Sequence, residues 1–452
     1  MSGVTRVRSE RSKGNRPADD VPSTETPREW QSKTRIAFRF SVLYLGLFAL
    51  ATQISGSLLP NSAFYYRGLG RLWPMRDVTF SVARHVFGAS IAAEEVTSNG
   101  EPLFFWVQTF WILIVALAGT ALWTSLDRQR REYATAHAWF RLFLRFALAA
   151  SMFEYGMTKV IPTQFPAPSL ETLVTPAGDL SLSAMLWTSI GASPAYEIFT
   201  GCVEILGAVL LVFPRTTLLG AIVSLAAATQ VFALNMTFDI GLKLISFHLM
   251  LLALVLLAPD LRRLADLVVW NRATTPRREV PLARTARGQR IAVMAQLAMG
   301  VWLLGMYTFI NVRFWHVGGG GRPQSALYGI WNVEQMSVDE VTQPAVLNDY
   351  DRRWRRVIFD EPKTITFQRT DDSFARYDGT IDTATKTFDI RKAGSRQWRT
   401  QFSYEQPAPD RLRLDGTMDG HRLEVQLRQV NPDTLRLLNS HFRWVRMHEQ
   451  RQ

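Results

Sequence analysis

The chain has 452 residues, of which 47% are apolar and 20% are charged, and it contains a single cysteine. This length suffices for two or three structural units with a large buried core. The composition excludes a collagen, a fully disordered chain and a disulfide scaffold, because one cysteine cannot form an internal bridge. The net charge of +12 suggests nucleic acid as one partner. The distribution of the charges along the chain favours a membrane instead.

Seven stretches are long and apolar enough to cross a bilayer as helices, which takes about 20 residues each. The third and sixth contain ionisable residues, so hydropathy alone identifies them less clearly than the others. The seven predicted spans are Ile36–Leu59, Leu103–Ser125, Trp139–Ile161, Ala195–Phe213, Thr217–Asn235, Gly241–Pro259 and Ile291–Ile310.

Lys and Arg residues alternate between the connections of these spans. They gather before the first span and after the second and sixth, and Arg215 follows the fourth. The alternate connections contain far fewer: Arg67, Arg71, Arg76 and Arg84 in the first, none in residues 161–213, and Lys243 beside the third. Because cytoplasmic loops collect cations, this pattern predicts a cytoplasmic N-terminus and an extracytoplasmic C-terminal domain. The cations then lie against an anionic lipid leaflet, and no nucleic-acid partner is expected. Residues 1–30 are rich in Ser, Thr, Pro and charge, and we expect them to be disordered.

The pattern changes after Gly318–Gly321, which we expect to be a flexible joint. Short segments with alternating apolar residues follow, separated by turn residues such as Asp419-Gly420, and this spacing predicts an antiparallel barrel or sandwich. The predicted strands are Gly329–Glu334, Arg353–Phe359, Thr364–Arg369, Phe374–Ile381, Thr387–Ile390, Trp398–Tyr404, Arg411–Gly416, His421–Arg428 and Leu435–Val445.

The first strand opens with Gly329-Ile330-Trp331, which resembles the Gly-x-Trp signature of lipocalin-like barrels. The resemblance implies that Trp331 closes the barrel base and that a late Arg packs across its face, with Arg436 or Arg443 as the candidates. An eight-stranded barrel either holds one small ligand or fills itself with side chains, and the sequence leaves both open.

Polar residues recur at one depth of the predicted helical bundle. The predicted topology places them in the outer half of four consecutive helices, where a charge costs at least about 2.5 kcal/mol and therefore requires a partner or a function. Either an ion pair such as Glu204–Lys159 fixes the helix register, or the groups line a ligand pocket. We expect no metal site, because no second ligand stands near His248. The candidates are Glu154, Lys159, Glu204, Gln230, Asn235, Asp239, Lys243 and His248.

Several of these residues also carry a family resemblance. Arg145, the segment Glu154–Lys159 and Glu204 followed by Gly207 resemble the pattern of the DoxX/DoxD membrane family, over roughly residues 139–267. The resemblance implies a four-helix unit in a bacterial inner membrane, with a quinone or another lipid-soluble molecule as partner in a redox system.

The sequence thus predicts a membrane all-α bundle with a DoxX-like four-helix core, followed by a C-terminal β-barrel. The predicted domains are a cytoplasmic N-terminus (1–30), two helices (31–138), the four-helix unit (139–270), a basic loop with the last helix (271–317) and the barrel (318–452). The first functional hypothesis is that the bundle binds a quinone or another lipophilic molecule and works with a redox protein partner. The alternative is a non-enzymatic module whose barrel holds a ligand or a partner protein.

Overall fold

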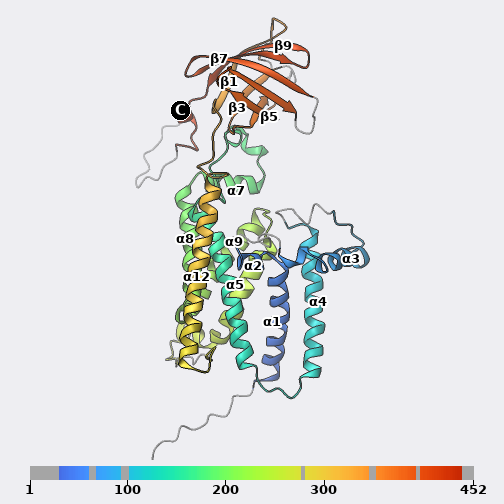
Figure 1. Ribbon diagram of the computed structural model, residues 1–452, viewed down its shortest axis with the longest axis vertical. Coiled ribbons are helices and arrows are strands. Elements are labelled where there is room, and N and C mark those ends of the chain that lie inside the picture. The colour runs from blue at the N-terminus through green and yellow to red at the C-terminus, as the bar shows by residue number, and fades with distance from the viewer. Residues whose placement is uncertain are drawn as a thin grey trace, which may run out of the picture.

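The computed structural model describes residues 30–60, 68–92, 101–275, 280–345, 353–392 and 398–439. A helical unit comes first in the chain, and a β-barrel follows it. The barrel lies next to the end of the helical unit that contains α7 (Figure 1). The helices are α1 (Ser32–Ala51), α2 (Gln53–Ser57), α3 (Met75–Phe87), α4 (Leu103–Leu126), α5 (Ala134–Val160), α6 (Leu170–Val174), α7 (Leu182–Gly191), α8 (Pro194–Val212), α9 (Thr217–Thr237), α10 (Lys243–Leu257), α11 (Leu261–Val268) and α12 (Ala286–Trp315).

Within the part of the chain that the structure describes, six helical segments are long and apolar enough to cross a membrane: Ser32–Ala51, Leu103–Leu126, Pro194–Val212, Pro214–Thr237, Lys243–Val268 and Ala286–Trp315. Helix α5 is not among them, because its ionisable residues lower its hydropathy. It nevertheless has 27 residues and a long buried face. Each of the seven predicted spans is therefore largely helical in the structure, and the protein has the helices of a membrane protein.

The first predicted span is not one continuous helix. Thr52 has an extended backbone (φ −103°, ψ 177°) and separates α1 from α2. Its hydroxyl donates to Phe48 O at 2.8 Å, which satisfies a carbonyl at the end of α1. The break turns α2 onto α5, where the main-chain oxygen of Ser57 accepts a hydrogen bond from Tyr307 of α12 at 2.8 Å.

Helices α5, α8, α9 and α10 form the predicted four-helix unit, with α12 and α2 packed on α5. Small residues bring the helices close together. A Cβ atom at Gly207 of α8 would lie 2.7 Å from Ser224 Oγ of α9, and one at Gly220 would lie 2.7 Å from Leu211 N. Such close approach is a common basis of helix association in lipid.

The strands are β1 (Gly329–Val338), β2 (Val341–Thr342), β3 (Trp354–Phe359), β4 (Thr364–Arg369), β5 (Phe374–Asp382), β6 (Thr387–Lys392), β7 (Arg399–Ala408), β8 (Arg411–Met418) and β9 (His421–Gln429). Strands β1 and β3 to β9 pair antiparallel in chain order, and β1 also pairs with β9. This pairing closes an eight-stranded barrel, to which β2 adds a short hairpin. The predicted hairpin at Asp419-Gly420 is confirmed, with positive φ at both residues as a type I′ turn requires.

Apolar side chains fill the barrel interior. Alternate residues of the strands point inward, as the two-residue period of a strand requires. Trp354 stacks on Phe367 with 4.1 Å between ring centroids, and Phe388 stacks on Phe402 at 5.3 Å. The structure therefore favours the filled barrel over the ligand-holding one.

Two expectations for the ends of the barrel domain are wrong. Leu435–Asn439 forms turns rather than a ninth long strand, because a 3-10 turn at Pro432–Thr434 ends the extended chain. Residues 440–445 of that predicted strand lie outside the described residues. The joint after α12 is packed rather than free, since a Cβ atom at Gly320 would lie 2.4 Å from the Trp315 ring.

The barrel is anchored on α6 of the helical unit. Leu170 packs with Ile330 and Ile358, and its backbone N–H donates to Asp360 Oδ2 at 2.9 Å. Asp360 also pairs with Arg322 at 2.9 Å, and Arg376 of β5 pairs with Glu171 of α6. These contacts hold the barrel over the end of the unit at which α5 ends and α8 begins.

Candidate functional site

The candidate site begins with the crossing of α5 and α8. A Cβ atom at Gly201 would lie 2.7 Å from both Gly156 O and Lys159 Cβ, so only glycine fits there without movement. Gly156 is as tightly placed, with Gly201 O at 3.0 Å from its hypothetical Cβ. The two glycines allow the backbones to touch, and they bring the next turn of each helix within side-chain reach.

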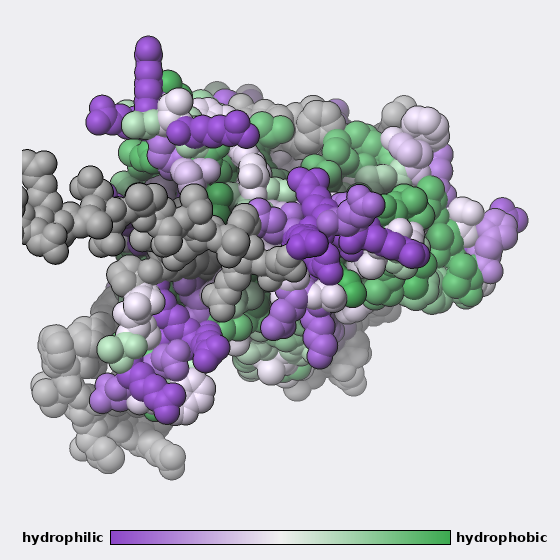
Figure 2. Space-filling model, turned by 90° about the horizontal axis from the view of Figure 1, so that it is seen from below, coloured by the Kyte–Doolittle hydropathy of each residue, from purple (hydrophilic) through white to green (hydrophobic). Residues whose placement is uncertain are grey.

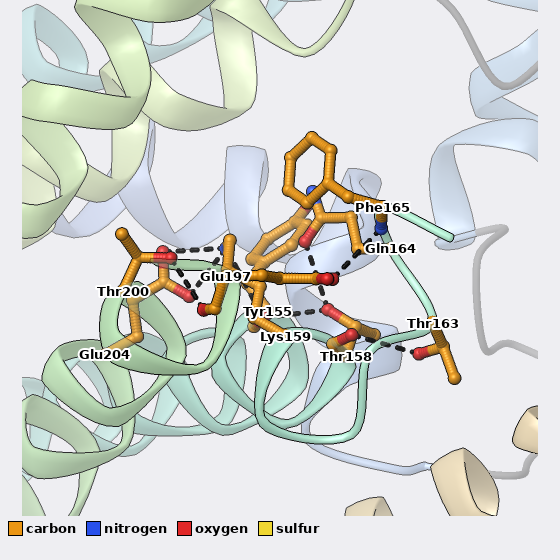
Figure 3. Close-up of polar contacts among 9 residues, drawn as sticks. All are labelled: Tyr155, Thr158, Lys159, Thr163, Gln164, Phe165, Glu197, Thr200 and Glu204. Atoms are coloured by element: carbon orange, nitrogen blue, oxygen red, sulfur yellow. Dashed lines mark hydrogen bonds and ion pairs between the residues drawn. The ribbon is translucent and has the colours of Figure 1, made fainter. Parts of the chain in front are cut away.

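That next turn carries a buried ion pair between Lys159 and Glu204. Lys159 Nζ donates to both carboxylate oxygens of Glu204, at 2.7 Å and 2.8 Å (Figure 3). The two side chains are only 7% and 3% exposed. Lys159 Nζ also donates to Tyr155 O at 3.4 Å and lies 5.9 Å from the Tyr155 ring. Each charge is stable in this poorly hydrated place only because the other is beside it, since a single unpaired ion buried there is very unfavourable.

The pair lies in the wall of a cavity of about 100 Å³. Helices α5, α7, α8, α9 and α10 all contribute to this cavity. Its apolar walls include Met152, Leu186, Trp187, Ile190, Leu234 and Leu249, and its polar lining consists of Lys159, Gln164, Thr200, Glu204, Gln230, Asn235 and Ser246. A mostly apolar pocket with a few converging polar groups is typical of a small-molecule site.

The cavity opens at the side of the helical unit, between α8 and α9. Two of its lining residues are exposed there, Tyr196 of α8 at 45% and Gln230 of α9. Both helices are among the segments apolar enough to span a membrane, so this surface faces lipid if the helices lie in a bilayer. A ligand dissolved in the lipid then reaches the Lys159–Glu204 pair without crossing water.

Glu197 is a buried carboxylate that the sequence analysis did not single out. It lies in the first turn of α8 and is 0% exposed. Its Oε1 accepts the backbone N–H of Phe165 at 3.0 Å, while Oε2 has no hydrogen-bond partner in the structure. Figure 3 shows its side chain between the ion pair and the Gln164-Phe165 segment. The signal that could have identified it is an acidic residue seven positions before Glu204, on the same helix face.

Four of the eight predicted polar residues line the cavity together: Lys159, Glu204, Gln230 and Asn235. The amide of Asn235 donates to Ser246 Oγ and to Leu242 O, both at 3.2 Å, and so connects α9 to the start of α10. Half of the predicted set therefore lies around one cavity, and its role as a ligand site stays a prediction.

The other four predicted residues are placed elsewhere. Glu154 lies on another face of α5 and accepts a hydrogen bond from Ser57 of α2. His248 is stacked on Phe48 of α1, with 3.4 Å between ring centroids, and its Nε2 lies 2.9 Å from the Tyr44 hydroxyl. Asp239 and Lys243 pair at 2.8 Å at the surface, with side chains 87% and 24% exposed. None of these four side chains lines the cavity.

Two residues of the predicted barrel signature, Gly329 and Trp331, lie in β1. Gly329 has φ +149°, and a Cβ atom there would lie 2.4 Å from Gln429 Nε2. Trp331 is 1% exposed, and its Nε1 donates to Leu327 O at 3.0 Å. Arg436 lies in the turns after β9, and Arg443 lies outside the described residues. Packing of either arginine on Trp331 stays a prediction.

Among the residues that the structure describes, no three His, Cys, Asp or Glu side chains are grouped as metal ligands. The comparison with curated proteins finds the uncharacterized protein YwoB of Bacillus subtilis, which is 39% identical over 126 residues. The match covers 28% of this chain and 77% of that protein. No family model and no solved structure match the chain.

Proposed function

The chain belongs to the family of the Bacillus subtilis protein YwoB, and we propose that it binds a quinone or a similar lipophilic molecule in the cavity at Lys159 and Glu204. The proposal includes the predicted setting, a bacterial inner membrane with the barrel outside, and a DoxX-like role in a redox system. It rests above all on one observation, which is a largely apolar cavity with a buried ion pair in its wall.

The chemistry of the pair suits a molecule with carbonyl or hydroxyl oxygens. Lys159 has three N–H donors and no acceptor. Glu204 accepts two of them, and the third makes only a long bond of 3.4 Å to Tyr155 O, for which a ligand oxygen can compete. A ligand oxygen in the cavity can share the ammonium group, while the apolar walls hold a ring or an isoprenoid chain. A ligand without such an oxygen makes no hydrogen bond to Lys159. It also displaces water from the ion pair, which weakens its binding.

The pair also fits a ligand that exchanges protons. Reduction of a quinone to a quinol takes up two electrons and two protons, and we propose that a redox protein partner supplies the electrons. Lys159 or Glu204 is then the group nearest to the ligand oxygens that can pass a proton, which is the usual role of a positioned acid or base. Glu197 lies close by as a further carboxylate for the same purpose.

Mass spectrometry of the purified protein tests the proposal. Isoprenoid quinones extracted from the wild-type protein are expected in near-stoichiometric amount, and the Lys159→Met protein is expected to have lost most of them. Lys243→Met is the matched control, since that lysine is paired at the surface outside the cavity lining. The proposal fails if the wild-type protein contains no quinone and gives no thermal shift with added ubiquinone-1 or menadione.

A further inference from the structure

A second cavity lies at the opposite end of the helical unit from the barrel. It has a volume of about 210 Å³ and lies between the first half of α5, the turn before α9, the end of α10 and the segment leading into α12. Figure 2 shows this end of the molecule, where hydrophilic side chains gather in patches across the face and apolar side chains flank them. The positive-inside pattern predicts that this is the cytoplasmic end.

Three basic side chains from one face of α5 line this cavity: His137, Arg141 and Arg145. They are four residues apart, so each lies roughly one helical turn above the last. Arg145, the deepest, is only 8% exposed and donates to Gln296 of α12 and, at 3.4 Å, to Thr217 of α9. Arg145 is thus enclosed by α5, α9 and α12.

The other polar groups that the described residues contribute to this cavity are the hydroxyl of Thr217 and the amides of Gln289 and Gln296. Gln289 accepts the N–H groups of Leu282 at 3.1 Å and Ala283 at 3.3 Å, which holds the segment before α12 over the cavity. Val280 and Leu282 on that segment, together with Leu142 and Leu256, add apolar surface beside the basic groups. The cavity therefore offers cations at its centre and apolar side chains at its edge.

We infer that this cavity binds a phosphate-bearing anion, with the head group of an anionic phospholipid such as phosphatidylglycerol as its source. Arginine binds phosphate oxygens through two parallel N–H groups, and basic pockets between membrane helices on the cytoplasmic side are suited to anionic head groups. The apolar edge matches the first carbons of the acyl chains. Free phosphate shares the same chemistry and is distinguished from the lipid by the experiment.

The test is native mass spectrometry of the detergent-solubilised full chain. With added phosphatidylglycerol, we expect one retained lipid per chain, and phosphatidylcholine should be retained far less. Arg141→Gln is expected to weaken retention at least about fivefold, since each cation near an anionic head group contributes about 1 kcal/mol. Arg141→Lys keeps the charge and should restore most of the binding.

Arg262→Gln is the control, because this arginine is exposed on α11 and does not line the cavity. A site specific for the head group leaves retention by Arg262→Gln unchanged. Inorganic phosphate at millimolar concentration is added in a second arm: binding of phosphate that Arg141→Gln abolishes, without retention of lipid, identifies free phosphate as the source. The inference is overturned if neither is bound, or if Arg262→Gln lowers retention as much as Arg141→Gln does.

Discussion

Lys159 packs directly against Gly201, so closely that a Cβ atom at position 201 would lie 2.7 Å from Lys159 Cβ. The glycine thereby determines where the lysine can stand, and Lys159 in turn reaches both oxygens of Glu204 one turn further along α8. The close helix contact and the buried ion pair are parts of one arrangement.

Gly201→Ala is expected to disturb that arrangement. The added methyl group meets backbone atoms of α5 and must push the helices apart, which typically costs about 1–3 kcal/mol in a well-packed interior. We expect a lower unfolding temperature and weaker quinone retention. Gly305→Ala on α12 is the control, because a Cβ atom there meets nothing within 4 Å. Equal melting temperatures for the two variants would show that the α5–α8 contact tolerates the methyl group.

Breaking the ion pair from either side is expected to be costly. Lys159→Met and Glu204→Gln each leave one buried group without its partner, which usually costs about 3–5 kcal/mol. The double variant should be less destabilised than the sum of the two single ones, because it leaves no lone charge. Denaturant unfolding in mild detergent measures the cycle. Additive effects would mean that the two charges do not depend on each other.

Glu101 provides a pH-dependent link between α4 and α10. Its carboxylate accepts the N–H groups of Leu244 at 2.5 Å and Ile245 at 3.3 Å, and burial raises its pKa above the usual 4.5 more than these bonds lower it. The folded state thus binds this proton more tightly than the unfolded state does. The stability from Glu101 is full below pH 4.5 and is lost as the pH rises through the raised pKa.

The Glu101→Gln variant isolates this effect. We expect the unfolding free energy of the wild type, minus that of the variant, to fall as the pH rises from 4.5 and to level off above the raised pKa. Thermal unfolding of both proteins in the same detergent at a series of pH values measures it. A difference that is constant across this range would contradict the assignment.

Trp187 and Ile240 form a wall shared between the ligand cavity and an open hollow of about 490 Å³ beside α7. Trp187→Ala should therefore open the cavity toward the barrel side.

A labelling experiment measures this opening. Leu249→Cys, in a chain whose Cys202 is replaced by Ser, places a thiol in the cavity wall. We expect a charged methanethiosulfonate reagent to label it about tenfold faster when Trp187 is Ala. Trp302→Ala on α12 is the control. Equal labelling rates of the Leu249→Cys chain with and without Trp187→Ala would show that Trp187 does not close the cavity.

Much of the fold could be predicted because hydrophobic length and alternation are local properties of the sequence. The spans followed from runs of apolar residues, and Thr364–Arg369 was predicted as the strand that the structure has. The break at Thr52 was not predicted, although polar residues and a glycine interrupt the apolar run from Thr52 to Ser57, because single polar residues are common within membrane helices. It depends instead on the packing of α2 against α5.

The sequence predicted the level along the helices at which the polar residues lie, but not the neighbouring helix toward which each side chain points. Glu154 and Lys159 are five residues apart on α5, so they face different neighbours, and only Lys159 points to α8. His248 was grouped with them by depth alone, although its partners Tyr44 and Phe48 come from α1. The rotation of each helix about its axis is a tertiary property, and hydropathy contains no information about it.

Photoaffinity labelling with an azido derivative of ubiquinone tests the central claim most directly. After irradiation of the purified protein and peptide mapping, we expect the label on cavity-lining segments of α5, α8 and α9. Unlabelled ubiquinone-1 should compete with it, and Lys159→Met should lose it while Lys243→Met keeps it. Label spread over lipid-facing helices such as α4, without competition and unchanged in Lys159→Met, would contradict a quinone site at Lys159 and Glu204.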